Sequence, residues 1–219
     1  MGQRERAVQS NHRPTVKFRR MKDRRRDQIM AAAWKVFARR GVASASIADI
    51  TRAAKISVGT FYLYFPNKEE LLGRLLDEST RILRQTLAEA FETAGPPLDR
   101  FERAGRAFFR NFCLRRREML ILILRESVGF SPAIENKRKR MFQILIGDVA
   151  GAITRVTGAA GRPGRRQSEV VAVSIIGMLE RVAYHYYIWQ TGTKDLSKVE
   201  TEALNFIRDG LGSVLPRGE

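Results

Sequence analysis

The sequence predicts an all-α protein with a small helical domain at the N-terminus and a larger helical domain after it. Apolar residues recur at three- and four-residue steps along most of the 219-residue chain, which is the spacing of one helix face. Alternation of apolar and polar residues, the pattern of a half-buried strand, never lasts beyond a few residues. Hydrophobic residues make up 44% of the chain, enough for a substantial core.

The first 26 residues differ in composition from the rest of the chain. Residues 1–26 contain ten Lys or Arg and two acidic residues, with few apolar ones. Because such a segment cannot bury enough apolar surface to fold alone, we expect a basic flexible arm. Two interpretations remain open for it: an arm that lies along DNA, and a solvated tail without a partner.

Two helices joined by a short connection are predicted after this arm. The first begins at Asp27 and runs to Gly41, which is suited to cap a helix C-terminus. The second follows Ser46, because Ser46 and Asp49 form a weak version of a capping box. The apolar face of this second helix consists of Ile47, Ile50 and Ala54.

A third, very short helix is predicted at residues 58–65. Ser57 is suited to cap its start, Pro66 ends it, and Asn67 caps a fourth helix of residues 67–90. At about 100° per residue, the inward side of residues 58–65 consists of Val58, Phe61, Tyr62 and Phe65. The opposite side consists of Gly59, Thr60, Leu63 and Tyr64. A strand would not separate these residues as cleanly.

The outer side of the third helix has chemistry that suits the major groove of DNA. Gly59 lets the backbone approach closely, Thr60 can bond to base edges, and Leu63 adds an apolar contact. Tyr62 lies on the border between the inward and outer sides and Tyr64 on the outer side, and the hydroxyls of both can reach phosphate oxygens. The alternative is that the two tyrosines merely complete a small core.

Lys68 adds a charge next to this helix. It lies in the first turn of the fourth helix, where backbone N–H groups already attract phosphate, so we expect it to contact DNA as well. A helix, a tight turn and a second short helix form the helix-turn-helix arrangement, whose second helix enters the major groove.

The residue order F…G…SIADITRAAKISVGTFYLYFPNKEELL resembles the N-terminal DNA-binding domain of TetR-type transcriptional repressors. The matching residues are Phe37, Gly41, Ile50, Ala53, Ala54, Val58, Gly59, Tyr62, Phe65, Lys68 and Leu71. The resemblance is firm for residues 27–75 and only architectural beyond. It implies a three-helix DNA-binding domain at 27–75 and a helical ligand-binding and dimerisation domain at 76–219.

The resemblance also suggests how DNA is read. Many relatives carry histidine where this chain has Tyr64, and family contacts on the second helix map to Ser46, Ile47 and Ala48. Only Ser46 among these three has a hydrogen-bonding side chain, so we expect base readout to depend mainly on Thr60 and Leu63, with considerable reliance on DNA shape. The candidate DNA-binding residues are Ser46, Ser57, Gly59, Thr60, Tyr62, Leu63, Tyr64 and Lys68.

The larger domain is predicted to contain five further helices. Their expected ranges are 98–113, 116–127, 132–157, 168–191 and 197–214. One stripe of the 168–191 helix consists of Ile175, Met178, Leu179, Val182, Tyr186 and Trp189. The family resemblance implies that this helix and residues 203–215 pair across a two-fold axis, and an ordinary intramolecular core is the alternative.

An apolar pocket is expected among these helices. The candidate ligand-binding residues are Phe108, Phe109, Phe112, Leu122, Arg125, Glu126, Met141, Phe142, Leu145 and Met178, and the apolar ones would serve equally as plain core. Arg125 and Glu126, like Glu180 and Arg181, either pair with each other, face solvent or contact a polar ligand group. Residues 122–142 resemble relatives that sense fatty acyl-CoA, which implies that the basic run at 137–140 meets phosphates; a solvated face is the alternative.

Composition narrows the class of protein. Forty basic against 23 acidic residues give a net charge of +17, which favours a polyanionic partner. The single cysteine, Cys113, excludes internal disulfides and favours a reducing compartment. The longest apolar run, residues 119–124, is too short to cross a bilayer, and the polar N-terminus has no signal-peptide pattern. We therefore expect a cytoplasmic protein without a membrane partner.

These observations favour a homodimeric repressor that binds a palindromic operator and is released by a hydrophobic small molecule such as a fatty acyl-CoA. The alternative is a non-specific basic nucleic-acid-binding or architectural protein. Catalysis is not expected, because the two histidines, His12 and His185, belong to no catalytic motif and no phosphate-binding loop or nucleophile elbow is present. Neither a cofactor nor a metal is expected.

Overall fold

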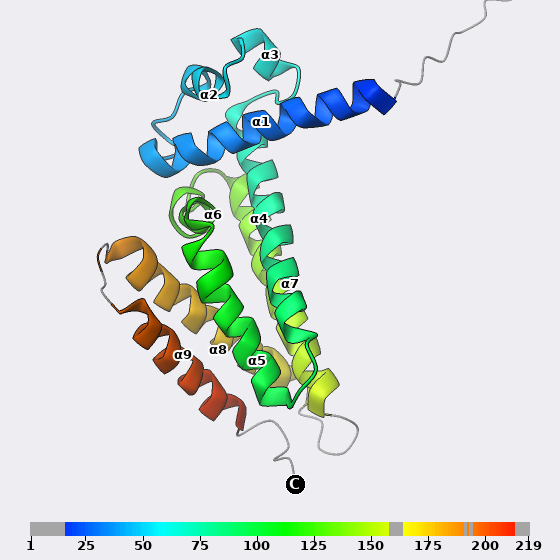
Figure 1. Cartoon of the computed structure of the whole chain (residues 1–219), viewed down its shortest axis with the longest axis vertical. Coiled ribbons are helices and arrows are strands. Elements are labelled where there is room, and N and C mark those ends of the chain that lie inside the picture. The colour runs from blue at the N-terminus through cyan, green and yellow to red at the C-terminus, as the bar shows by residue number, and fades with distance from the viewer. Residues whose placement is uncertain (1–15, 158–163, 191, 193–194, 213–219) are drawn as a thin grey trace, which may run out of the picture.

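The computed structural model describes residues 16–157, 164–190, 192 and 195–212. Its regular structure is helical, and no strand occurs in these ranges, as the sequence predicted. A small N-terminal layer contains α1 (Val16–Arg40), α2 (Ile47–Ala54) and α3 (Val58–Tyr62). Helix α4 (Lys68–Phe91) runs from this layer into a larger helical body, as Figure 1 shows.

The larger body consists of the remaining helices, three of which continue as wider π-helical turns. Its elements are α5 (Pro97–Ala107) with η1 (Phe108–Leu114), α6 (Arg117–Ile121) with η2 (Leu122–Glu126), α7 (Pro132–Thr157), α8 (Arg165–Ala183) with η3 (Tyr184–Trp189), and α9 (Leu196–Gly212). Each predicted helix of the larger domain therefore has a counterpart. Helix α7 packs against both α4 and α8, and α5 packs against α4 and α9.

Helix α1 starts well before the predicted position. It begins at Val16, so residues 16–26 continue the first helix rather than forming part of a flexible arm. The physical reason is that residues 16–40 contain neither glycine nor proline, and Lys and Arg are good helix formers even where apolar spacing is absent. Residues 1–15, the rest of the predicted arm, lie outside the described residues.

The core of the N-terminal layer follows the predicted apolar faces, with two corrections on α3, at Val58 and at Tyr62, which is 53% exposed. Ile29, Phe37, Ile50 and Phe61 are completely buried. Val58, predicted to point inward, is 45% exposed, because α3 ends at Tyr62 and is too short to bury both of its ends.

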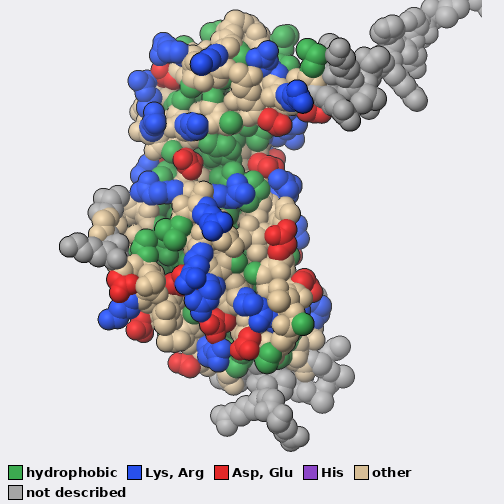
Figure 2. Space-filling model, viewed as in Figure 1, with side chains coloured by type: hydrophobic (Ala, Val, Ile, Leu, Met, Phe, Trp, Pro, Cys, Tyr) green, Lys and Arg blue, Asp and Glu red, His purple; other side chains and the backbone are tan. Residues whose placement is uncertain are grey.

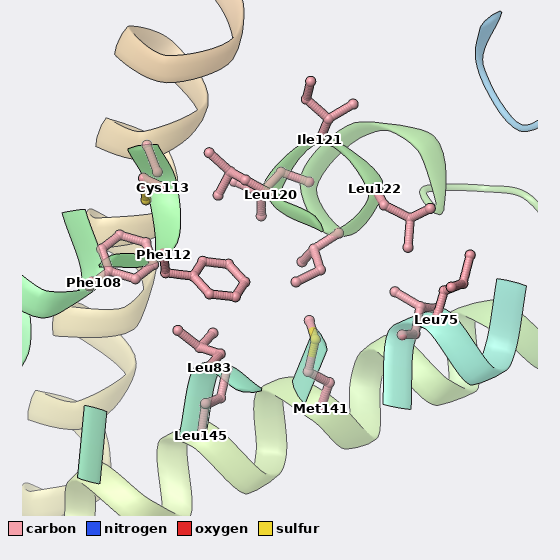
Figure 3. Packing of buried hydrophobic residues seen from close by; sticks show 14 of the residues in the cluster. Leu75, Leu83, Phe108, Phe112, Cys113, Leu120, Ile121, Leu122, Met141 and Leu145 are labelled. Carbon is pink, nitrogen blue, oxygen red and sulfur yellow. The ribbon is translucent and has the colours of Figure 1, made fainter. Parts of the chain in front are cut away.

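The core of the larger body lies between α4, η1, α6 and α7. Figure 3 shows Leu75 and Leu83 of α4 facing the side chains of Phe112, Leu120 and Met141. Cys113 is fully buried in the same cluster, and burial raises the pKa of its thiol well above the usual value, as expected of an unreactive core cysteine. Gly105 lets α5 approach α9 closely, since a Cβ there would lie 2.5 Å from Leu204 Cδ2.

Candidate functional site

Helix α3 presents an uncovered face at one end of the molecule. Ser57 caps its start by accepting a 3.0 Å hydrogen bond from the backbone N–H of Thr60, and Phe61 anchors it in the core. On the opposite side Tyr62 is 53% exposed and Leu63 is 76% exposed. Figure 1 shows α3 at the end of the molecule farthest from the larger body. Thus α3 is held by one aromatic anchor and offers its other side to a partner.

The polar groups on and near α3 are partly occupied within the protein. The hydroxyl of Thr60 lies 2.8 Å from that of Ser57, and Thr60 is half-buried. Ser46 Oγ donates to Asp49 Oδ2 and accepts from the Asp49 backbone N–H, which confirms the predicted capping box. Tyr64, expected on the outer face, is half-buried against the core. Of the candidate DNA contacts on α3 and just after it, Tyr62 is therefore the most accessible polar side chain.

Lys68 does not direct its ammonium group toward the α3 face. Its Nζ donates to the backbone carbonyls of Val42 at 2.7 Å, Ala45 at 2.9 Å and Ala43 at 3.2 Å. An ammonium has three donors, so the turn between α1 and α2 occupies all of them. The expected phosphate contact is thus replaced by a structural role, because these carbonyls belong to a turn and not to a helix that would supply their donors.

Glu126 holds the same turn from the side of the larger body. Its Oε2 accepts a 2.8 Å hydrogen bond from the backbone N–H of Val42, and its Oε1 accepts one of 2.6 Å from Arg125 Nε. Gly41 has φ +76°, and a Cβ there would lie 2.8 Å from Glu126 Oε2. Arg125 and Glu126 therefore pair with each other at the junction between the domains, away from the cavities described next.

A cavity of about 430 Å³ opens between α4, α5, α7 and α8. Its inner walls are apolar, and they include Leu87, Phe91, Phe101, Leu145, Ile176 and Leu179. Its remaining lining includes a set of polar residues, namely Arg81, Arg84, Gln85, Glu92, Asp148 and Arg155. The cavity therefore combines a mostly apolar interior with a charged margin, which is the composition of a small-molecule site.

The charged margin of this cavity is only partly neutralised. Arg84 bonds to Asp148 across α4 and α7, with Nε 2.6 Å from Oδ2, and Arg81 pairs with Glu78 at 2.7 Å. Arg155 is exposed and has no ion pair with any residue in the described part of the chain. A positive group is thus available for an anion.

A second, smaller cavity of about 50 Å³ adjoins the first and shares Leu87, Leu145, Ile176 and Leu179 with it. Five of the ten predicted ligand-binding residues line this smaller cavity, namely Phe108, Phe112, Met141, Phe142 and Leu145. Three others lie outside both cavities: Phe109 stacks on Tyr187, while Leu122 and Met178 pack in the core. Five of the predicted residues thus line the smaller cavity, and of these Leu145 also lines the larger one.

Glu180 is an acidic group at the wall of the smaller cavity. It is half-buried, and burial raises the pKa of its carboxyl, while the charges of Arg138 and Arg181 oppose this shift. The carboxyl therefore holds its proton to higher pH than a solvated glutamate.

The basic run at 137–140 does not form one free patch. Lys137 Nζ pairs with Asp77 at 2.8 Å, and Arg138 donates to Ser127 Oγ at 3.0 Å and to the carbonyl of Ile123. Lys139 and Arg140 are exposed. Two of its four charges thus stabilise contacts of α7 with α4 and η2, and the predicted phosphate site is divided.

Part of the chain matches a known family of proteins. Residues 29–75 match the family model of the bacterial regulatory proteins of the tetR family. This match identifies residues 29–75 as a DNA-binding domain of the tetR type. HTH-type transcriptional regulator LuxR of Vibrio harveyi is 36% identical over 77 residues, which are 35% of this chain and 37% of LuxR. The chain therefore spans well under half the length of this curated relative.

Solved structures extend the likeness to the larger body. FadR from Bacillus subtilis, solved in complex with stearoyl-CoA, aligns with a TM-score of 0.73 and 17% identity over 84% of this chain and 98% of its own. AibR, solved with isovaleryl coenzyme A and operator DNA, aligns with a TM-score of 0.67 and 17% identity over 84% and 97%. At these identities the likeness shows the fold, with the helix-turn-helix layer at one end and a helical domain behind it.

The structure adds functional candidates that the sequence did not reveal. The positive margin of the larger cavity comes from Arg81, Arg84 and Arg155, which lie on two helices far apart in the chain. Figure 2 shows Lys and Arg side chains gathered over the helix-turn-helix layer on the visible face. No helix in the described ranges has the length and apolar character needed to span a bilayer.

Proposed function

We propose that this TetR-family protein is a homodimeric transcriptional repressor that binds a palindromic operator and releases it when an amphipathic small molecule fills the larger cavity. The observation that carries the proposal is the uncovered face of α3. It combines a glycine with exposed Tyr62 and Leu63 at the end of the molecule. These groups suit a major groove, where a short helix can reach base edges and flanking phosphates.

The outer faces of α8 and α9 support dimer formation. Val170 and Val173 of α8 are 58% and 49% exposed, and Phe206 of α9 is 70% exposed. Helices α8 and α9 contact each other along one side of the body. A second copy placed against this side would bury these apolar groups in a four-helix arrangement.

This dimer surface differs from the predicted stripe. Leu179 and Ile175 of that stripe line the larger cavity, so they face the interior of the same protomer. The proposed interface lies on the next face of α8, at Val170 and Val173, while Trp189 at the end of η3 is 65% exposed. Two-fold pairing would then present two α3 helices to one duplex.

The effector that best fits the larger cavity is an amphiphile with an anionic head group. Its apolar part would lie against Phe91, Phe101 and Leu179, and its head group would lie near Arg84 and Arg155 at the margin. The complexes of FadR with stearoyl-CoA and of AibR with isovaleryl coenzyme A support a coenzyme A thioester as the first compound to test.

A physical route joins this cavity to the DNA-binding layer. Ile123 and Leu124 line the smaller cavity, and two residues later Glu126 binds the backbone of Val42. Helix α4 also runs from the cavity wall to Lys68, which binds the same turn. A ligand that favours one arrangement of η2 and α4 would shift the orientation of α3 and so change operator affinity.

The test begins with selection of duplexes from a randomised library by the full-length chain. Operator affinity is then measured by fluorescence anisotropy, with and without stearoyl-CoA, isovaleryl-CoA, free coenzyme A and stearate. We expect a palindromic consensus and at least a tenfold loss of affinity with one thioester. Equal affinity for all duplexes would contradict the repressor and favour the architectural alternative. Selective binding unaffected by all four compounds would contradict the proposed effector class.

Single substitutions test the proposed roles of Tyr62 in operator binding and of Arg155 in effector binding. Tyr62→Phe is expected to weaken operator binding by roughly fivefold, since it removes one phosphate hydrogen bond of about 1 kcal/mol. Arg155→Gln is expected to weaken the thioester effect and leave operator binding unchanged. Arg140→Gln, an exposed substitution on the same helix α7 away from the cavity lining, serves as its control.

A further inference from the structure

The N-terminal part of α1 projects beyond the domain that it belongs to. Among the side chains of α1 that the structure describes, the first buried one is Ile29, which is completely buried, whereas Met21 is 63% exposed. Figure 1 shows α1 running under α2 and α3 and continuing past them as a free helical end. Residues 16–26 would span about 16 Å at about 1.5 Å per residue, which corresponds to about five base pairs of duplex.

This helical end is strongly basic. Its basic residues are Lys17, Arg19, Arg20, Lys22, Arg24, Arg25 and Arg26, and Asp23 is its one acidic residue. At about 100° per residue these cations are distributed around the helix rather than along one face. Any side of the helix that meets a polyanion therefore offers several positive charges.

Two of these cations, Arg24 and Arg25, are exposed and contribute little to the fold. Arg25 donates to Gln28 on its own helix at 2.9 Å, and Arg24 and Arg25 form no ion pair with any residue that the structure describes. The first turn of α1 contains no acidic residue, so its cations lie at the positive end of the helix dipole, where they disfavour the helix. A bound polyanion would reverse this unfavourable interaction.

The direction of the projection identifies where a polyanion would lie. In Figure 1 the free end of α1 points to the side opposite α8 and α9. Those two helices carry the proposed dimer face, so in the dimer both free ends would point away from the two-fold axis. They would thus extend over duplex outside the two half-sites, rather than over the centre of the operator.

We propose that residues 16–26 form a helical clamp that binds phosphates of the DNA flanking each half-site on its outer side. This inference rests on the proposed dimeric DNA-binding function and adds a contact that depends on duplex length but not on flanking sequence. An anionic membrane surface fits less well, because Val16, Phe18 and Met21 do not share one face of the helix and so provide no apolar stripe for insertion.

The experiment compares two duplexes and two triple variants of the full-length chain. One duplex carries only the two selected half-sites, and the other adds ten base pairs of scrambled sequence on each side. The clamp variant is Lys17→Gln/Arg20→Gln/Arg24→Gln. The control variant, Lys139→Gln/Arg140→Gln/Lys198→Gln, removes the same charge from exposed positions in the larger body.

For the wild type and the control variant, we expect at least tenfold tighter binding to the flanked duplex than to the short one. The clamp variant should bind the short duplex like the wild type and gain less than threefold from the flanks. On the flanked duplex, its slope of log affinity against log salt concentration should be shallower than that of the wild type by about 0.9 for each phosphate that it no longer neutralises. Helicity measured by circular dichroism should rise on binding the flanked duplex only.

Other outcomes separate the two proposals. Selective binding with no benefit from the flanks would overturn the clamp and leave the operator-binding function standing. Equal affinity for every duplex of the library would overturn both. A third outcome concerns vesicles of phosphatidylserine and phosphatidylcholine. If the wild type binds them, the clamp variant does not, and the flanks have no effect on DNA binding, residues 16–26 would be assigned to a membrane surface and the clamp would be overturned.

Discussion

The carboxylate of Glu126 accepts a 2.8 Å hydrogen bond from the backbone N–H of Val42, and this bond joins two residues 84 positions apart. It connects η2, beside the smaller cavity, to the turn between the first two helices of the DNA-binding layer. Removing the acceptor should therefore affect both stability and the response to a ligand. The contact also explains why an acidic residue follows a long apolar run.

Glu126→Ala is expected to lower the free energy of unfolding by about 1–3 kcal/mol, because the partly buried N–H of Val42 loses its acceptor. It should also weaken the effect of the thioester on operator affinity. Urea unfolding and anisotropy titrations measure the two effects. Glu126→Gln keeps an acceptor oxygen and should recover most of the stability. Glu118→Ala, at an exposed position on α6, should change neither quantity.

Lys68→Met is expected to destabilise the N-terminal layer by about 2 kcal/mol, because the carbonyls of Val42, Ala43 and Ala45 lose their shared donor. Operator affinity should fall through this loss of structure, while the salt dependence of binding should stay the same. Lys35→Met, at an exposed position on α1, is the matched charge control. A shallower salt slope for the Lys68 variant alone would restore the phosphate contact that the sequence suggested.

Val149→Phe is expected to fill part of the larger cavity without disturbing α3. The added ring would occupy space that an effector needs, so the loss of operator affinity on adding the thioester should be at least tenfold weaker than in the wild type. Operator affinity without ligand should stay within twofold. Ile144→Phe enlarges an exposed residue of the same helix and should respond like the wild type. An unchanged response in the Val149 variant would place the effector elsewhere.

Glu180→Gln is expected to stabilise the protein at neutral pH. Burial raises the pKa of Glu180 above its usual 4.5, so the folded state binds a proton more tightly than the unfolded state. The wild type therefore loses stability as the pH rises through 4.5 toward the raised pKa, whereas the glutamine variant does not. Melting temperatures should coincide at about pH 4 and favour the variant at about pH 7. The reverse order at neutral pH would mean that the carboxylate forms a stabilising pair with Arg138 or Arg181.

The sequence predicted the architecture well because apolar spacing and caps are local signals. Helix α7 occupies residues 132–157, as predicted, with Pro132 in its first turn, where proline needs no hydrogen-bond partner. The capping box of Ser46 and Asp49 was likewise readable from residue types. The start of α1 was missed because charged residues continue a helix without leaving an apolar pattern.

The candidate site was less predictable because it depends on contacts between distant residues. Apolar spacing shows which face of a helix is buried, but not which backbone carbonyls come within reach of a side chain. Lys68 was therefore predicted to contact a DNA phosphate, although its hydrogen-bond acceptors lie 23 to 26 residues earlier in the chain. The margin of the larger cavity posed the same difficulty, since Arg84 and Asp148 meet across 64 residues.

Gly41 shows how closely the two domains constrain each other. Its backbone conformation excludes most other residues, and the space beside it is already taken by Glu126 from the opposite domain. Neither domain could therefore be exchanged for that of another protein without reproducing this fit. Chimeras that join the N-terminal domain of one protein to the larger domain of another should fold and respond to effector only when Gly41 and Glu126 come from the same parent.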